Sequence, residues 1–147
     1  LTETRRAVHA LRSDTLPLAD ELAKVTSTYA ERYHVTVSLD TDGDPRPVPP
    51  DATVALLRVA QEALVNAAKH GAGKPVTVGL DYGPAEVSLT VSNEVDALAR
   101  RTVELSTANA GYGLTGMRER LRILNGTLDA GQVGTCWTVR AQVPLPR

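Results

Sequence analysis

The chain has 147 residues, with 16 lysines and arginines against 17 aspartates and glutamates, so its formal net charge is −1. This length suits one domain, and the balanced charge excludes a general attraction to nucleic acid or to an anionic membrane. With one tryptophan, four tyrosines and no phenylalanine, the chain lacks platforms for base stacking. A single cysteine, Cys136, cannot form an internal disulfide, which suits a reducing compartment. We therefore expect a cytoplasmic domain without direct membrane contact. Because the chain opens at Leu1, we also expect a segment cut from a longer protein.

Apolar residues recur at helical spacing in some stretches and alternate with polar residues in others. The predicted elements are, in order, helix 1–12, helix 18–33, strand 35–39, a loop over 41–50, helix 51–70, strands 76–82 and 87–91, an aperiodic segment 94–112, helix 113–124, and strands 127–130 and 135–143. This order predicts an α/β (α+β) two-layer sandwich, in which helices cover one face of a mixed, mostly antiparallel sheet. Because each strand alternates, we expect the other sheet face to be wet.

Four polar residues share one face of the helix predicted over 51–70. Glu62, Asn66, Lys69 and His70 fall within ~100° of each other, beside the apolar stripe of that helix. A carboxylate, an amide, an ammonium and an imidazole at the edge of a buried surface suit a metal–phosphate site. Asn66 Oδ1 can ligate Mg²⁺ together with phosphate oxygens, and Lys69 can neutralise phosphate charge. The alternative is a solvated helix face held by contacts between residues four apart.

A glycine-rich stretch precedes the helix predicted over 113–124. It contains Gly111, Gly113 and Gly116. Backbone N–H groups at the start of a helix bind anions, and the missing side chains let a phosphate approach closely. The stretch is neither a P-loop nor a dinucleotide-binding turn, because the residues that complete those motifs are missing. A flexible loop followed by a capped helix explains the same pattern.

Two further polar residues lie on predicted strands. Asn93 extends the inward face of the strand over 87–91, where a polar group must find a partner. Asn93 either hydrogen-bonds an adenine or ties down the adjoining loop. Thr135 opens the last predicted strand and shares an inward face with Trp137. Its hydroxyl either meets a ligand or belongs to an ordinary threonine at the end of a strand.

Three segments, taken in order, resemble the GHKL ATPases, the group that holds histidine kinases, gyrase, MutL-type repair ATPases and the heat-shock chaperone ATPase. Within that group the chain is similar to the nitrate-sensor and desaturase-regulator type of histidine kinase, in its actinobacterial branch. The segments are RVAQEALVNAAKHGAG (58–73), GYGLTGMRERLRILNGTL (111–128) and GTCWTVRAQVPLP (134–146), which match the N box, the second glycine box and the closing strand. The resemblance covers almost the whole chain.

This resemblance implies the GHKL (Bergerat) ATPase fold and the ATP-binding catalytic domain of a bacterial two-component sensor kinase. Residues 1–12 correspond to the end of a dimerisation helix, residues 13–147 to the catalytic domain, and a stretch over about 94–112 to a lid. The implied cofactors are ATP and Mg²⁺. The implied partners are the protein's own dimerisation and phosphoacceptor domain, within a homodimer, and a response regulator. The full-length protein is expected to be anchored in a membrane.

The resemblance also implies roles for the site residues. Asn66 is the Mg²⁺ ligand, Glu62 joins it through water in the catalytic network, and Lys69 and His70 lie by the phosphates. The other residues that the resemblance implies in ATP binding are Gly111, Gly113, Leu114, Gly116 and Thr135. Of these, the three glycines would form the hinge of the lid, and Thr135 would support the nucleotide pocket.

One stretch departs from the pattern of the group. Asn93 stands where the first glycine box of the group has its adenine-reading aspartate, and both glycines of that box are absent from residues 93–97. The phosphoacceptor box is also absent, so we expect this chain alone to be inactive. Two alternatives stay open. One is an anti-sigma-factor serine kinase of the same fold, and the other is a degenerate, nucleotide-free scaffold domain that the altered box would suit.

Overall fold

The computed structural model describes residues 17–70, 73–94 and 116–146. The elements are α2 (Pro17–Tyr33), β1 (Val37–Asp42), α3 (Pro50–His70), β2 (Val76–Tyr82), β3 (Glu86–Glu94), β4 (Thr127–Val133) and β5 (Cys136–Pro144). Residues 116–123 form a further helix. The strands form one sheet in the order β1-β2-β3-β5-β4. The pair β1–β2 is parallel, and the other three pairs are antiparallel.

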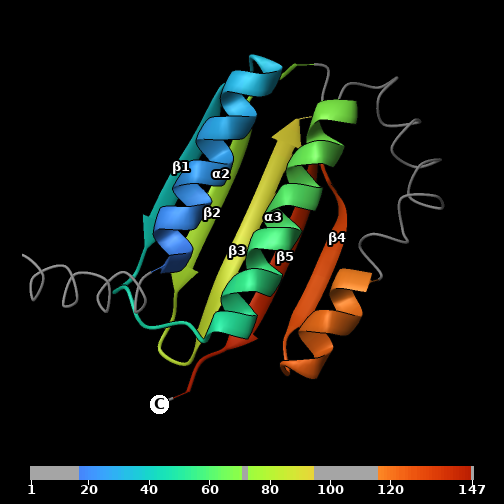
Figure 1. Ribbon diagram of the computed structural model, residues 1–147. Helices are drawn as coiled ribbons and strands as arrows, with labels where there is room; N and C mark the ends of the chain where they lie inside the picture. Colours follow the sequence, from blue (N-terminus) through green and yellow to red (C-terminus); the bar gives the residue numbers. More distant parts are fainter. Residues whose placement is uncertain (1–16, 71–72, 95–115, 147) are drawn as a thin grey trace, which may run out of the picture.

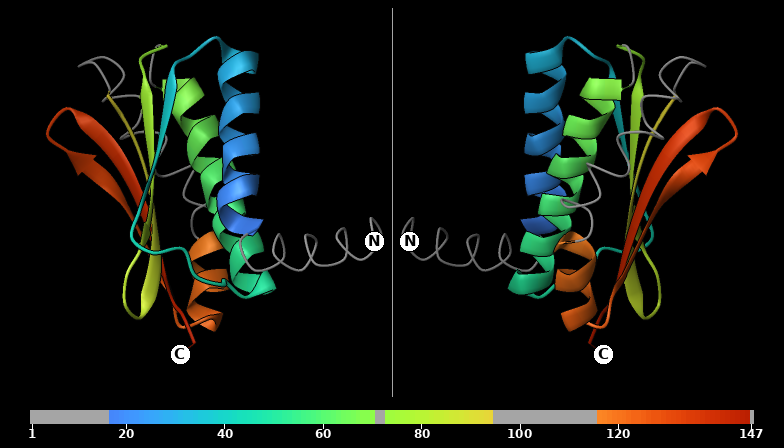
Figure 2. Two further views of the ribbon diagram at one scale, coloured as in Figure 1. Left: turned by 90° about the vertical axis from the view of Figure 1, so that its left-hand side faces the viewer. Right: turned by 90° about the vertical axis from the view of Figure 1, so that its right-hand side faces the viewer.

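The helices cover one face of this sheet. Helices α2 and α3 and the helix over 116–123 all lie on the same side (Figures 1 and 2). In β2 the buried positions alternate with exposed or half-buried ones, as expected of a strand with one covered face. Helix α3 packs on β3 and β5 and presents to them a stripe of small and aliphatic side chains. The predicted two-layer architecture and mixed sheet are confirmed.

The helix over 116–123 ends in a Schellman motif. Asn125 adopts a left-handed conformation with φ of 62°. The N–H of Gly126 donates to the carbonyl of Leu121 at 2.7 Å, and that of Asn125 donates to the carbonyl of Arg122 at 3.0 Å. A Cβ at Gly126 would lie 2.5 Å from the carbonyl oxygen of Gln142, so glycine is required there. This tight turn leads the chain directly into β4.

The sequence-based boundaries are wrong at the last hairpin. Strand β4 continues to Val133, and β5 begins at Cys136. The two residues between them, Gly134 and Thr135, form a turn in which Gly134 has φ of 62°. A glycine at the first position of a two-residue loop matches the twist of the flanking strands. No helix in the described part of the chain is long and apolar enough to cross a membrane.

Candidate functional site on the flank of α3

The polar residues of α3 are graded from solvent to interior. Lys69 is exposed, Glu62 is half-buried and Asn66 is buried, with 7% of its surface exposed. Each residue advances about 100° around a helix, so this is also their order around α3. The three side chains therefore cross the edge of the core on one flank, as the spacing predicts. His70 ends the helix, and its side chain lies outside the described residues.

A second buried amide lies at the same end of the molecule. Asn93 is 3% exposed and continues the inward face of β3, which confirms the prediction from alternation. Its neighbours in register are Val76 on β2 and Trp137 on β5. The C-terminal ends of β3 and α3 lie at one edge of the fold (Figure 1). Asn66 and Asn93 thus come from different layers and belong to the same end of the sandwich.

Among the described residues, the hydrogen bond of the Asn93 side chain is weak. Its Nδ2 donates to the backbone carbonyl of Glu94 at 3.5 Å, which is long for such a bond. A buried amide has two donors and an acceptor to satisfy, and leaving them unpaired costs free energy. The side chain therefore retains capacity to bind a further polar group.

The residues on this flank fit a magnesium–nucleotide site. In the described ranges no group of three or more histidines, cysteines, aspartates or glutamates could hold a metal ion by itself. Mg²⁺ does not require such a cage, because it commonly takes one or two protein oxygens and fills its octahedron with phosphate oxygens and water. Asn66 offers an amide oxygen at the core edge, and Glu62 offers a half-buried carboxylate one turn earlier.

The helix of the second glycine box is held against the sheet. Arg118 Nε donates to the backbone carbonyl of Leu128 on β4 at 3.1 Å, and Leu121 is fully buried. Gly116 is exposed at the start of this helix, and a Cβ there would meet nothing within 4 Å. The predicted site residues Gly111, Gly113 and Leu114 lie outside the described residues. So do the predicted helix over 1–12 and the predicted lid, except for Glu94, which belongs to β3.

Thr135 is not where the sequence pattern predicts. It lies exposed in the β4–β5 turn and is not on the inward face of a strand. The alternation along β5 extrapolates correctly back to Trp137, but the chain leaves the sheet at Cys136. The inward placement predicted for Thr135 is therefore wrong, and the role in the nucleotide pocket that the resemblance implies for it stays a prediction.

Trp137 is a candidate site residue that the sequence pattern alone does not indicate. It is half-buried and stands directly opposite Asn93 across the β3–β5 ladder. Side chains directly opposite in a ladder share a face of the sheet and are near neighbours. The sequence pattern places both residues on inward faces, but only the register of the two strands brings them together.

Residues 51–147 match the family described as histidine kinase-, DNA gyrase B-, and HSP90-like ATPase. The chain belongs to this family. The match begins at the start of α3 and includes both buried amides and the helix over 116–123.

Named relatives of the chain are sensor histidine kinases. The sensor histidine kinase MctS of Rhizobium johnstonii is 30% identical over 98% of this chain and 32% of the relative. The histidine-protein kinase/phosphatase DegS of Brevibacillus brevis is 28% identical over 87% of this chain and 33% of the relative. The nitrate/nitrite sensor protein NarX of Escherichia coli is 32% identical over 67% of this chain and 16% of the relative. The chain thus spans about a third or less of these relatives.

Solved histidine kinase structures share the fold. The catalytic domain of histidine kinase ThkA superposes with a TM-score of 0.68 at 14% identity, covering 89% of this chain and 94% of that one. Histidine kinase AdeS of Acinetobacter baumannii gives 0.64 at 15% identity, covering 91% of this chain and 66% of that one. The fold of this chain is therefore that of a histidine kinase catalytic domain.

Proposed function

We propose that this chain binds ATP with Mg²⁺ on the Asn66 flank of α3 and donates the γ-phosphate to a histidine on the dimerisation domain of a sensor kinase. A response regulator would then receive the phosphate. The observation that carries the proposal is the pair of buried amides, Asn66 and Asn93, at one end of a fold that belongs to an ATPase family.

The chemistry asked of the chain is positioning and neutralisation of charge. A transferred phosphoryl group carries negative charge on its oxygens, and enzymes of this class work by orienting it and balancing that charge. Asn66 Oδ1 would ligate Mg²⁺, which supplies the counter-charge for the phosphates when bound. Glu62 would hold a metal-bound water, and Lys69, at the exposed end of the gradient, would meet phosphate oxygens that project into solvent.

Asn93 would read the adenine base. Its Oδ1 can accept a hydrogen bond from the exocyclic amine of a purine, and Trp137 beside it offers an aromatic face. Among the described residues, the weak bond from Asn93 to Glu94 is the contact that favours the alternative role, in which Asn93 only ties down the backbone after β3.

The phosphate acceptor would come from another part of the full-length protein. The chain has three histidines, His9, His34 and His70, and none is followed by an acidic residue. We therefore expect no acid-labile label on this chain after incubation with γ-labelled ATP. The chain covers 32% of the sensor histidine kinase MctS, so that relative has room for further domains. We infer that the partner is a dimerisation domain of the same polypeptide, within a homodimer.

Calorimetric titration with a non-hydrolysable ATP analogue tests the proposal. The chain should bind the analogue, and it should bind more tightly with Mg²⁺ than with a chelator present. A nucleotide-free scaffold domain, which the altered first glycine box would suit, gives no heat of binding under either condition. That result would refute the proposed function.

A further inference from the structure

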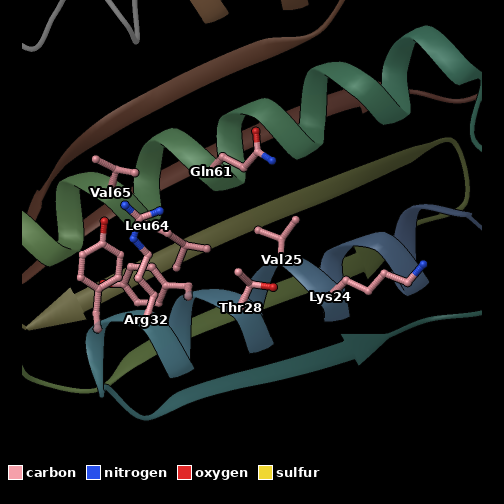
Figure 3. Close-up of a pocket in the computed structure, with 9 residues that line it drawn as sticks. Lys24, Val25, Thr28, Arg32, Gln61, Leu64 and Val65 are labelled. Carbon is pink, nitrogen blue, oxygen red and sulfur yellow. The ribbon is translucent and has the colours of Figure 1, made fainter.

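A solvent-facing groove runs between α2 and α3, on the other flank of α3 from Asn66 (Figure 3). Its volume is about 330 Å³. Its apolar lining includes Val25, Tyr29, Leu64 and Val65, of which Tyr29 and Leu64 are buried and form the floor. Its charged lining residues, Lys24 and Arg32, are exposed and form the rim. The groove lies outside the proposed nucleotide site, and the function proposed above does not use it.

Large exposed apolar side chains gather at this groove. The described residues include four such side chains, and two of them, Tyr33 and Val65, line it with 38% and 37% of their surfaces exposed. Val54, 50% exposed, lies 11 positions before Val65 and so shares its stripe of α3. Ile123 is on a different helix. Single exposed apolar residues are ordinary on a protein surface, but a group of them along one groove indicates a contact site.

The charged side chains that line the groove are both cations. Lys24 and Arg32 lie two turns apart on one face of α2. Glu21 pairs with Lys24 at 3.2 Å, but the two side chains are 47% and 73% exposed, and such a pair is weak and exchangeable. The Arg32 guanidinium lies 5.7 Å from the ring centroid of Tyr33, another residue of the groove lining. An acidic partner would therefore complement this rim.

The shape indicates what kind of partner fits. Two packed helices form a linear trough, into which the side-chain ridge of a third helix can pack. We propose that the groove between α2 and α3 is a docking site for an amphipathic helix of a partner protein, with apolar side chains at i, i+4 and i+7 flanked by acidic residues. The apolar side chains would rest on Val25 and Val65, and the carboxylates would meet Lys24 and Arg32.

Two other occupants match the rim less well. Residues 1–16 carry three arginines against Glu3 and Asp14, so they would bring net positive charge to a cationic rim. A two-fold contact with a second copy would place the same surface on both sides, so two cationic rims would be brought together.

Designed peptides test this site directly. The probes are fluorescein-labelled amphipathic helical peptides with leucine at i, i+4 and i+7 and glutamate beside them, together with the same peptides carrying lysine in place of glutamate. In anisotropy titrations the wild-type chain should bind the glutamate set. The double variant Lys24→Glu/Arg32→Glu should bind that set at least about tenfold more weakly, a change of about 1.4 kcal/mol, and should now bind the lysine set.

Matched variants separate this site from general effects. Arg140→Glu reverses an exposed cation on the uncovered face of the sheet and should leave peptide binding unchanged. Val65→Ser should weaken binding, whereas Ile123→Ser, at a side chain that is 81% exposed, should not.

Four results would overturn the proposal. In the first, no glutamate peptide binds, and in the second, Arg140→Glu weakens peptide binding as much as Lys24→Glu/Arg32→Glu does. In the third, the chain self-associates and Lys24→Glu/Arg32→Glu abolishes this self-association. In the fourth, the chain binds anionic vesicles but no peptide. The last two would assign the groove to a second copy or to a lipid surface.

Discussion

The two flanks of α3 lie about 100° apart around the helix and differ in almost every property. On one flank, Asn66 and Glu62 bring a buried amide and a half-buried carboxylate to the core edge. On the other, Gln61 and Val65 border an apolar groove whose charged lining is cationic. The first flank lies wholly within the part of the chain that matches the ATPase family, whereas the α2 wall of the second precedes that part. One helix can therefore carry a polar site for a small anion and an apolar site for a partner, because its buried stripe holds both in place.

A substitution in the buried stripe of α3 should have the largest effect, and it should act on the stability of the fold. Leu64 is 1% exposed and belongs to both the core and the groove floor. Leu64→Ala should lower the free energy of unfolding by about 2–5 kcal/mol, because it removes buried methyl groups and leaves a cavity. Urea denaturation would measure this change, with Val54→Ala at an exposed position of the same helix as control. A loss in Leu64→Ala no greater than in the control would show that the stripe does not hold the two flanks.

Asn93→Ala should weaken nucleotide binding and leave peptide binding in the α2–α3 groove unchanged. ATP affinity should fall by about 1 kcal/mol or more and GTP affinity by less, because a hydrogen-bond acceptor for the adenine amine is lost. Asn93→Asp should keep or tighten ATP binding, unless desolvation of the new carboxylate outweighs the stronger bond. Paired ATP and GTP titrations would measure both.

Ser92→Ala is the matched control for Asn93. Its Oγ lies 3.2 Å from Thr138 Oγ1, on the other face of the sheet. An unchanged ratio of ATP to GTP affinity in Asn93→Ala would remove Asn93 from the site.

Trp137 can report which flank is occupied, because it is the only tryptophan in the chain. Its position opposite Asn93 predicts that nucleotide binding changes its emission, whereas an acidic peptide in the α2–α3 groove leaves it unchanged. Fluorescence titration with each ligand would test this difference. Trp137→Phe should abolish the signal and change nucleotide affinity by about 1 kcal/mol at most. Equal emission changes from both ligands would argue against separate sites.

Tyr82→Phe should have the smallest effect on stability and should change binding at neither flank of α3. The Tyr82 hydroxyl is buried and has no hydrogen-bond partner in the described part of the chain. Burial, with a smaller contribution from the negative charge of Asp20, raises the pKa of Tyr82 above 10.0. A raised folded-state pKa gives stability that is complete below pH 10 and is lost as pH rises through the folded-state value.

The variant Tyr82→Phe should therefore be as stable as wild type at neutral pH, and it should lose less stability on alkaline titration. Thermal unfolding across pH would measure this. The idea fails if wild type and variant lose stability in parallel above pH 10.

The sequence predicts the architecture and part of the site, for reasons visible in particular residues. Helical spacing places Glu62, Asn66 and Lys69 on one flank, and alternation places Asn93 inward, because both depend only on local geometry. The placement of Thr135 fails, since the end of a strand depends on the turn that the hairpin adopts. The neighbour relation of Asn93 and Trp137 depends on the register between strands, which sequence spacing does not contain.

The groove between α2 and α3 also could not be predicted from the sequence. Its two walls are separated by β1 and a loop, and the apolar pattern of each helix predicts burial without saying where solvent begins. Tyr33 and Val65, far apart in the chain, become one surface only when the helices pack on the sheet.

The assignment of Asn66 as the Mg²⁺ ligand is tested by how ATP binding depends on Mg²⁺. Calorimetric titration of a non-hydrolysable ATP analogue, with Mg²⁺ and with a chelator, would be repeated on wild type, Asn66→Ala and the adjacent Val65→Ser. We predict that Mg²⁺ tightens binding in wild type and in Val65→Ser but not in Asn66→Ala, because only that variant lacks the ligand oxygen. The same Mg²⁺-dependent tightening in Asn66→Ala as in wild type would contradict the assignment of the metal site to this flank of α3.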